Sequence, residues 1–170
     1  MKEAAAPLTL ALYQPDIPQN AGTMLRMCAC LGVEAAIIEP AGFPTSDRHF
    51  RRSGMDYLDL VTIRRHPSFS AFEAWRREAG AHGPRRLVLL STRAAASYLD
   101  CDYQTGDILM VGRESAGVPD EVFAAADVAV SIPMRPQARS LNVAIAAAMV
   151  LGEALRQIDP HAGHVRGRTA

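Results

Sequence analysis

The segment from Ile132 to Leu155 constrains the fold more than any other part of the chain. Its first half contains Pro133 and Pro136, which cannot donate backbone hydrogen bonds and favour extended conformations in the residues before them. After Ser140, a good N-cap residue, a run of Leu, Val, Ile, Ala and Met without proline predicts a helix. The loop therefore delivers Arg139, Ser140 and Asn142 to a helix N-terminus, where free N–H groups favour anionic or acceptor-rich ligands.

The predicted helix is apolar on nearly every face from Leu141 to Leu151, whereas a helix with one solvated side shows a polar stripe. A membrane span needs an uncharged run of about 18 residues. This run is shorter and ends with Glu153 and Arg156, so we reject a transmembrane helix. Two kinds of burial remain: packing between the parent domain and a second copy of the chain, or a central place in a monomer core. We favour the first, which predicts a homodimer.

The length of 170 residues suits one domain, which we place at residues 1–158, followed by a flexible tail at residues 159–170. The 18 basic and 18 acidic residues cancel, so no global field attracts nucleic acid. All basic residues except Lys2 are arginines, whose forked guanidinium matches phosphate oxygens. Local arginine clusters are therefore candidates for RNA contacts.

The three cysteines form no disulfide framework, which favours a reducing compartment. The N-terminal residues MKEAAAPL lack a basic region followed by a long apolar segment, so we expect a cytoplasmic protein. Cys28 and Cys30 lie two apart in a predicted helix and point to different faces, which is poor geometry for a shared metal. We expect both to be small core residues, and we expect no metal.

The N-terminal part of the chain predicts a βαβ unit. A strand, a loop, a helix and a second strand follow one another within about forty residues: Leu8–Tyr13, Gln14–Gly22, Thr23–Leu31 and Ala35–Glu39. Further apolar runs predict strands at Leu60–Ile63, Leu87–Ser91, Ile108–Val111 and Val128–Ile132. Ligands in such α/β folds bind beyond the carboxyl ends of the strands, and Asn20 and Arg26 lie in that position.

A cluster of arginines lies in the segment DRHFRRSG, residues 47–54. Arg48, Arg51 and Arg52 belong to it, and at helical spacing Arg48 and Arg52 share a face. Arg65, after the third predicted strand, extends the same surface. The cluster is either a phosphate-contacting patch or a solvated helix face, and the sequence leaves both open.

Three segments together resemble the motifs of a known family. PDIPQNAGTMLR, LMVGRESAGVP and IPMRPQARSLNVAIAAA are similar, in order and spacing, to the three motifs of the SPOUT RNA 2'-O-ribose methyltransferases. The IIEPAGF and RRSGMDY segments look most similar to the minimal TrmL/YibK group of that family. That group modifies the wobble nucleotide of tRNA, a cytidine or a modified uridine.

The resemblance implies an α/β fold with a Rossmann-like parallel sheet and a C-terminal trefoil knot that binds S-adenosylmethionine. It also implies an obligate homodimer in which the partner chain completes the site. Carried over by motif, the residues implied to bind the cofactor are Leu90, Gly112, Ile132 and Ser140. The residues implied to act in catalysis are Arg26, Asn20, Glu114, Ser140 and Asn142.

The implied reaction moves a methyl group from a sulfonium to a ribose 2'-hydroxyl. Because a guanidinium stays protonated in proteins, we interpret Arg26 as a clamp for the target phosphate or the developing oxyanion, oriented by Glu114. Each residue also has a structural alternative: Asn20 and Ser140 as helix caps, and Glu114 as an ion-pair partner of Arg113. At the level of function, ribosomal RNA 2'-O-ribose methylation and a non-catalytic RNA- or nucleotide-binding module are the alternatives.

Overall fold

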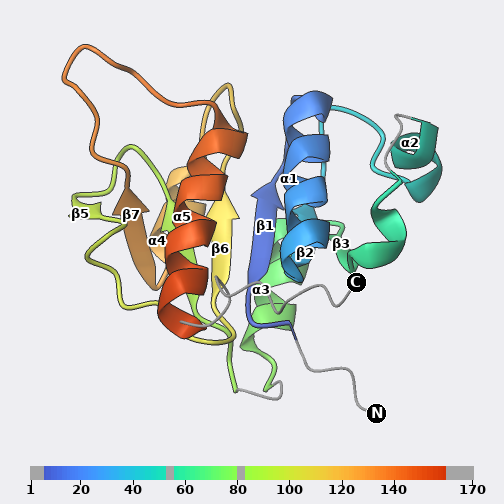
Figure 1. The fold of residues 1–170 in the computed structure, drawn as a ribbon, viewed down its shortest axis with the longest axis horizontal. Helices are drawn as coiled ribbons and strands as arrows, with labels where there is room; N and C mark the ends of the chain where they lie inside the picture. Colours follow the sequence, from blue (N-terminus) through green and yellow to red (C-terminus); the bar gives the residue numbers. More distant parts are fainter. Residues whose placement is uncertain (1–5, 53–55, 80–82, 160–170) are drawn as a thin grey trace, which may run out of the picture.

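Seven strands form one sheet in the computed structural model, which describes residues 6–52, 56–79 and 83–159 (Figure 1). The strands are β1 (Thr9–Tyr13), β2 (Glu34–Ile38), β3 (Ile63–His66), β4 (Leu87–Leu90), β5 (Ala96–Ser97), β6 (Ile108–Val111) and β7 (Val128–Ser131). Their order is β3-β2-β1-β6-β4-β7-β5, and every neighbouring pair is parallel. The predicted α/β fold with a parallel sheet is thus confirmed.

Helices cover both faces of this sheet (Figure 1). They are α1 (Pro18–Leu31), α2 (Asp47–Arg52), α3 (Phe69–Arg77), α4 (Asp120–Ala125) and α5 (Val143–Ile158), with a 3-10 helix, η1, at Leu58–Leu60. Alternation along β1 shows the layers: Leu10 and Leu12 join the core under α1 and α5, while Ala11 and Tyr13 join the core under α3 and α4. Strands buried on both faces explain the unbroken apolar runs in the sequence.

The first helix begins five residues before the predicted start. Pro18 is its first residue, a position where the missing N–H costs nothing and the fixed φ suits a helix. The helix ends at Gly32, whose φ of +66° is readily adopted by glycine. The predicted loop at Gln14–Gly22 is therefore wrong beyond Ile17, and Asn20 lies in the first turn of α1.

The third strand is displaced from its predicted position. Residues 58–60 form the 3-10 helix, and the strand runs through Ile63–His66, where its one partner among the described strands is β2. At this edge of the sheet Arg64 and Arg65 are exposed, so the strand lacks the apolar run that marks a buried one. The two-residue strand β5, on the opposite edge, was missed for the same reason.

The cap of α5 also differs from the prediction. Asn142, and not Ser140, is the N-cap: its Oδ1 accepts from the backbone N–H groups of Ala144 at 2.9 Å and Ile145 at 3.3 Å. Ser140 lies two residues earlier, in the exposed loop. The predicted Ser140 cap is therefore wrong.

The apolar helix α5 is only partly covered by its own chain. One side packs on α1 and the sheet through residues such as Val150 and Leu151. On the other side Ile145 and Met149 are 56% and 38% exposed, and Leu141 in the preceding loop is 40% exposed. Within the described residues, no helix has the length and apolar character needed to cross a membrane.

Two smaller expectations have different outcomes. Cys28 is buried as predicted, but Cys30 is exposed, because residues two apart on a helix face different sides. Apart from Asp159, the predicted tail at 159–170 lies outside the described residues, and the domain boundary stays a prediction.

Candidate functional site

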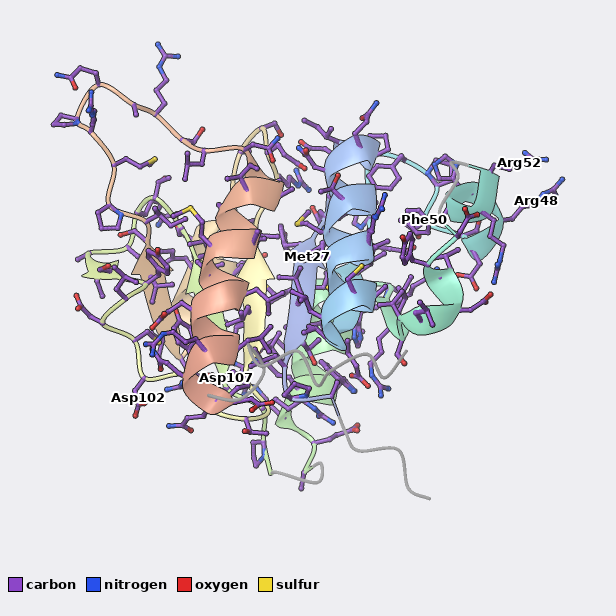
Figure 2. The ribbon with its side chains drawn as sticks, in the orientation of Figure 1. Met27, Arg48, Phe50, Arg52, Asp102 and Asp107 are labelled. Atoms are coloured by element: carbon purple, nitrogen blue, oxygen red, sulfur yellow. The ribbon has the colours of Figure 1, made fainter. Side chains whose placement is uncertain are left out.

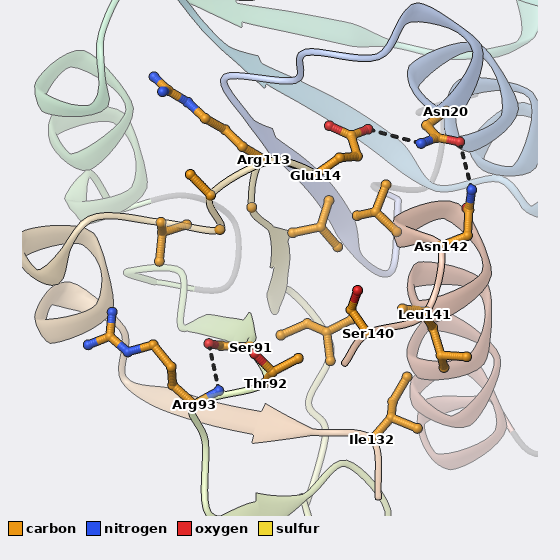
Figure 3. Close-up of a pocket in the computed structure, with 18 of the residues that line it drawn as sticks. Asn20, Ser91, Thr92, Arg93, Arg113, Glu114, Ile132, Ser140, Leu141 and Asn142 are labelled. Atoms are coloured by element: carbon orange, nitrogen blue, oxygen red, sulfur yellow. Dashed lines mark hydrogen bonds between the residues drawn. The ribbon is translucent and has the colours of Figure 1, made fainter. Parts of the chain in front are cut away.

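A cavity of about 510 Å³ opens at the carboxyl ends of three adjacent strands (Figure 3). Leu90 ends β4, Gly112 follows β6, and Ile132 follows β7, and all three residues line the cavity. In a parallel sheet the carboxyl ends meet at one edge, so loops far apart in sequence converge there. The cavity is within the size range of small-molecule and cofactor sites.

The wall next to β6 is a tight turn. Arg113 and Gly117 exchange two backbone hydrogen bonds, at 3.0 and 2.9 Å, and Gly117 has a φ of +62°. A Cβ on Gly112 would lie 2.7 Å from the carbonyl carbon of Gly117, closer than such atoms can approach. The absence of a side chain at Gly112 therefore lets the turn fold back against its own strand.

The opposite wall is the loop of residues 132–142, which rises away from β7 and returns to the start of α5 (Figure 1). Ile132, Met134, Ser140, Leu141 and Asn142 from this loop line the cavity. The loop supplies both apolar surface and the N-terminal end of a helix. Ser140 is thus placed where the sequence predicts a site residue, although it caps no helix.

Three side chains from separate segments form a hydrogen-bonded chain beside the cavity (Figure 3). Asn20 Nδ2 on α1 donates to Glu114 Oε1 at 3.2 Å, and Asn142 Nδ2 donates to Asn20 Oδ1 at 3.0 Å. These contacts join residues 94 and 122 positions apart. Asn20 is not the cap of α1, because the N-cap of that helix is Ile17. The alternative for Glu114 was an ion pair with Arg113, but the structure shows a hydrogen bond from Asn20.

The carboxyl group of Glu114 has an unusual environment. Burial, together with its hydrogen bond to Asp16, raises the pKa of Glu114. The hydrogen bond with Glu114, supported by one from Ser115, lowers the pKa of Asp16 to about 2. Of the two carboxyl groups, Asp16 therefore loses its proton first, while Glu114 holds a proton more readily than an ordinary glutamate.

Arg26 lies apart from the other predicted site residues. Its guanidinium lies 4.7 Å from the centre of the Tyr57 ring, and its Nη2 donates to the Tyr57 hydroxyl at 3.3 Å. It follows Asn20 by six residues on the same helix, so the two side chains leave α1 in different directions. Arg26 does not line the cavity. The structure thus brings together every predicted catalytic and cofactor residue except this one.

The predicted RNA patch contains two kinds of arginine. Arg51 pairs with Asp59 at 2.6 Å, and Arg65 pairs with Asp47 at 2.5 Å. Arg48 and Arg52 point away from the body of the protein (Figure 2), and neither pairs with an acidic group of the described residues. Phe50, between them in sequence, is buried and anchors α2. Among the four predicted RNA-contacting arginines, Arg48 and Arg52 are therefore the two without an ion pair to the described residues.

Several cavity residues were missed by sequence reasoning. Ser91, Thr92, Arg93 and Arg113 also line the cavity, and each lies in the first three residues after a strand. That position was the available signal. Asp16, which lies within the first motif but outside the cavity, was not predicted either. Within the described residues, no group of three or more His, Cys, Asp or Glu side chains is arranged to hold a metal ion.

The sequence from residue 7 to residue 152 matches the SpoU rRNA Methylase family. A relative from Beijerinckia indica subsp. indica, named tRNA (cytidine(34)-2'-O)-methyltransferase, is 71% identical over 149 residues, which are 88% of this chain and 91% of the relative.

Two solved structures are also similar. One concerns the 2-OH methylation of C/U34 on tRNA and has a TM-score of 0.78 and 43% identity, covering 88% of this chain and 95% of its own. The other is the SpoU methyltransferase AviRb from Streptomyces viridochromogenes in complex with AdoMet, with a TM-score of 0.78 and 30% identity over 92% of this chain and 62% of its own.

Proposed function

Because this chain belongs to the SpoU rRNA methylase family, we propose that it methylates the ribose 2'-hydroxyl of the tRNA wobble nucleotide, using S-adenosylmethionine. The nucleotide is a cytidine or a uridine, in line with the names of the similar proteins. The observation that carries the proposal is the cavity at the strand ends, where all three motif segments contribute side chains.

The cavity suits the proposed cofactor. Leu90 and Ile132 offer apolar surface to an adenine ring, and the loop backbone around Gly112 and Ser140 offers polar groups. S-adenosylmethionine, when bound, supplies the reactive sulfonium methyl. The protein then has to hold the ribose hydroxyl in line with that methyl and to manage its proton.

We propose that Arg26 acts on the substrate from across a homodimer. In its own chain it lies outside the cavity, on the exposed side of α1, which packs beside α5. The exposed Ile145 and Met149 on α5 supply apolar surface for a second copy. A twofold arrangement of these helices would bring Arg26 of the partner subunit towards this cavity. There its forked guanidinium serves as a clamp for phosphate or oxyanion.

Two finer features belong to the same proposal. We infer a trefoil knot at the C-terminus, supported by the path of the 132–142 loop, which returns from β7 to a helix packed on α1 and β6. An experimental backbone without such threading would contradict it. We also infer a cytoplasmic location, supported by the tRNA substrate, and recovery of the protein in a membrane fraction would argue against that.

The proposed activity is tested by methyl transfer from tritiated S-adenosylmethionine to total tRNA and, separately, to ribosomal RNA. We expect label in tRNA, and mapping should place it on the ribose at position 34. Label in ribosomal RNA alone would instead identify the alternative substrate. Calorimetry with S-adenosylmethionine separates both from a non-catalytic RNA-binding module, which would give no binding heat.

A further inference from the structure

Asp16 connects the loop after β1 to the turn after β6 through hydrogen bonds. Its Oδ1 accepts a hydrogen bond from the backbone N–H of Glu114 at 3.1 Å, and its own backbone N–H donates to Glu114 Oε2 at 3.4 Å. Ser115 Oγ donates to the other carboxylate oxygen, Oδ2. The aspartate thus contacts both the backbone and the side chain of Glu114.

The opposite side of Asp16 is closed by Gly42. The Gly42 backbone N–H donates to Pro15 O at 2.9 Å, and a Cβ on Gly42 would lie 3.1 Å from Asp16 Cα and 3.3 Å from its Cβ. The backbone of Gly42 therefore lies directly against Asp16. This leaves Asp16 little room to move away from Glu114.

The contacts of Asp16 continue through side chains to α5. Glu114 accepts from Asn20, Asn20 accepts from Asn142, and Asn142 caps the helix. Asp16 itself does not line the cavity. It therefore forms the far end of a connected set of side chains whose other end lies at the cavity wall.

The charge of Asp16 acts on Glu114 directly. Among the groups around Glu114, Asn20 from α1 and Ser115 from the same turn are neutral. Arg113, the neighbour in sequence, carries its guanidinium 5.9 Å from the centre of the Tyr13 ring. Within the described residues, Asp16 is the charged group that hydrogen-bonds Glu114. Burial raises the pKa of the Glu114 carboxyl most, and the bond to Asp16 raises it further.

We propose that Asp16 is a positioning residue of the methyl-transfer site. It orients Glu114 directly and, through Glu114 and Asn20, it orients the Asn142 amide at the cavity wall. This inference rests on the proposed function. Asp16 does not line the cavity, so its influence falls on turnover more than on cofactor affinity.

The test starts with Asp16→Asn, which preserves the shape of the side chain but removes its charge. We expect kcat for tRNA methylation to fall about tenfold or more, and KM for S-adenosylmethionine to change less than about twofold. Asn20 donates to Glu114, and a carboxylate accepts such a bond more strongly than a carboxylic acid, so the ionised form is the active one. Without the charge of Asp16 the pKa of Glu114 falls, and the acidic limb of the kcat–pH profile should move to lower pH.

Three further variants show whether Asp16 acts through Glu114. In a Glu114→Gln background, Asp16→Asn should change kcat less than about twofold, because the partner it orients is already altered. Asp16→Glu keeps the charge and should leave the acidic limb in place. Asp102→Asn, at an exposed carboxylate remote from the cavity, should leave kcat unchanged.

The outcomes separate this inference from the proposed function. A wild-type protein that transfers no methyl group to tRNA would overturn the proposed function. If the wild type is active, any of three results would overturn the inference. The Asp16→Asn variant could keep its kcat, or the acidic limb of its kcat–pH profile could stay in place. The third result is that the fold-changes in kcat caused by the Asp16 and Glu114 substitutions multiply in the double variant, as they do for independent residues. If the Asp16→Asn variant does not fold, the Ser115→Ala variant replaces it, because that change removes one hydrogen bond to Asp16. We expect a smaller loss of kcat in Ser115→Ala. An unchanged kcat in that variant would also overturn the inference.

Discussion

At the scale of single residues, the structure separates side chains that shape the cavity from those that act on the substrate. Gly112 illustrates the first kind, because its neighbour is the rigid backbone of Gly117. We expect Gly112→Ala to lower the free energy of unfolding by about 1–3 kcal/mol, since a backbone contact at 2.7 Å has to be relieved. Chemical denaturation measures this, and an unchanged midpoint would show that the turn yields easily.

Arg26 illustrates the second kind. We expect Arg26→Lys to lower kcat about 100-fold, because lysine keeps the charge but lacks the fork that grips two oxygens. Affinity for S-adenosylmethionine should stay the same, since Arg26 does not line the cavity. Arg77→Lys, at a surface ion pair with Glu73, is the matched control. Near-normal turnover of Arg26→Lys would contradict a bidentate clamp.

At the scale of elements, the N-terminal end of α5 contributes both to the stability of the fold and to the cavity wall. Asn142→Ala removes the cap bonds to two backbone N–H groups and the bond to Asn20, so we expect a loss of about 1–2 kcal/mol in the free energy of unfolding. Ser140→Ala, which removes no cap, should change that free energy by less than about 0.5 kcal/mol. Equal losses in thermal or chemical unfolding would show that the cap is assigned to the wrong residue.

The short helix α2 is the element expected to contact RNA. Replacing Arg48 and Arg52 together by alanine should weaken tRNA binding and reduce the slope of log affinity against log salt by about 1–2. Arg51→Ala should have a smaller effect, because that guanidinium is already paired with Asp59. Binding titrations at several salt concentrations measure the slope, and an unchanged slope would remove α2 from the RNA surface.

These elements also show what the sequence can predict. The strand at Ile108–Val111 was predicted with its observed ends, because a buried parallel strand needs an unbroken apolar run. The edge strand β3 carries exposed arginines and lacks that signal. The start of α1 was hidden by Pro18, which reads equally well as a loop residue or as a first helical residue.

The candidate site was predictable for a different reason. The predicted site residues between Leu90 and Asn142 lie in loops after parallel strands, and such loops meet at one edge of the sheet. In addition, the sequence motifs in these loops resemble those of a known family. The contact between Asp16 and Glu114 was not predictable, since it depends on the register of two loops 98 residues apart. The start of α1 was predicted too late in the sequence. For that reason the direction in which the Arg26 side chain leaves the helix was not predicted.

At the scale of the whole molecule, the proposed site is made by two chains. The cavity of one chain holds Glu114 and Asn142 but not Arg26, while the exposed apolar residues of α5 offer a surface for a second copy. We expect Ile145→Asp to dissociate the dimer, because a buried charge without a partner is costly. Sedimentation velocity should then show a monomer, and methyl transfer should be lost with it. A wild-type monomer in the same measurement would contradict the proposed dimer.

The most direct test of the shared site is coexpression of an Arg26→Ala chain with a Glu114→Gln chain, each expected to be nearly inactive as a homodimer. In a mixed dimer, the cavity of the first chain keeps Glu114 and receives Arg26 from the second, so one of its two sites is intact. Random pairing should restore about one quarter of the wild-type activity per chain. If Arg26 serves the cavity of its own chain, every site in the mixture carries a defect and activity stays at the level of the separate variants.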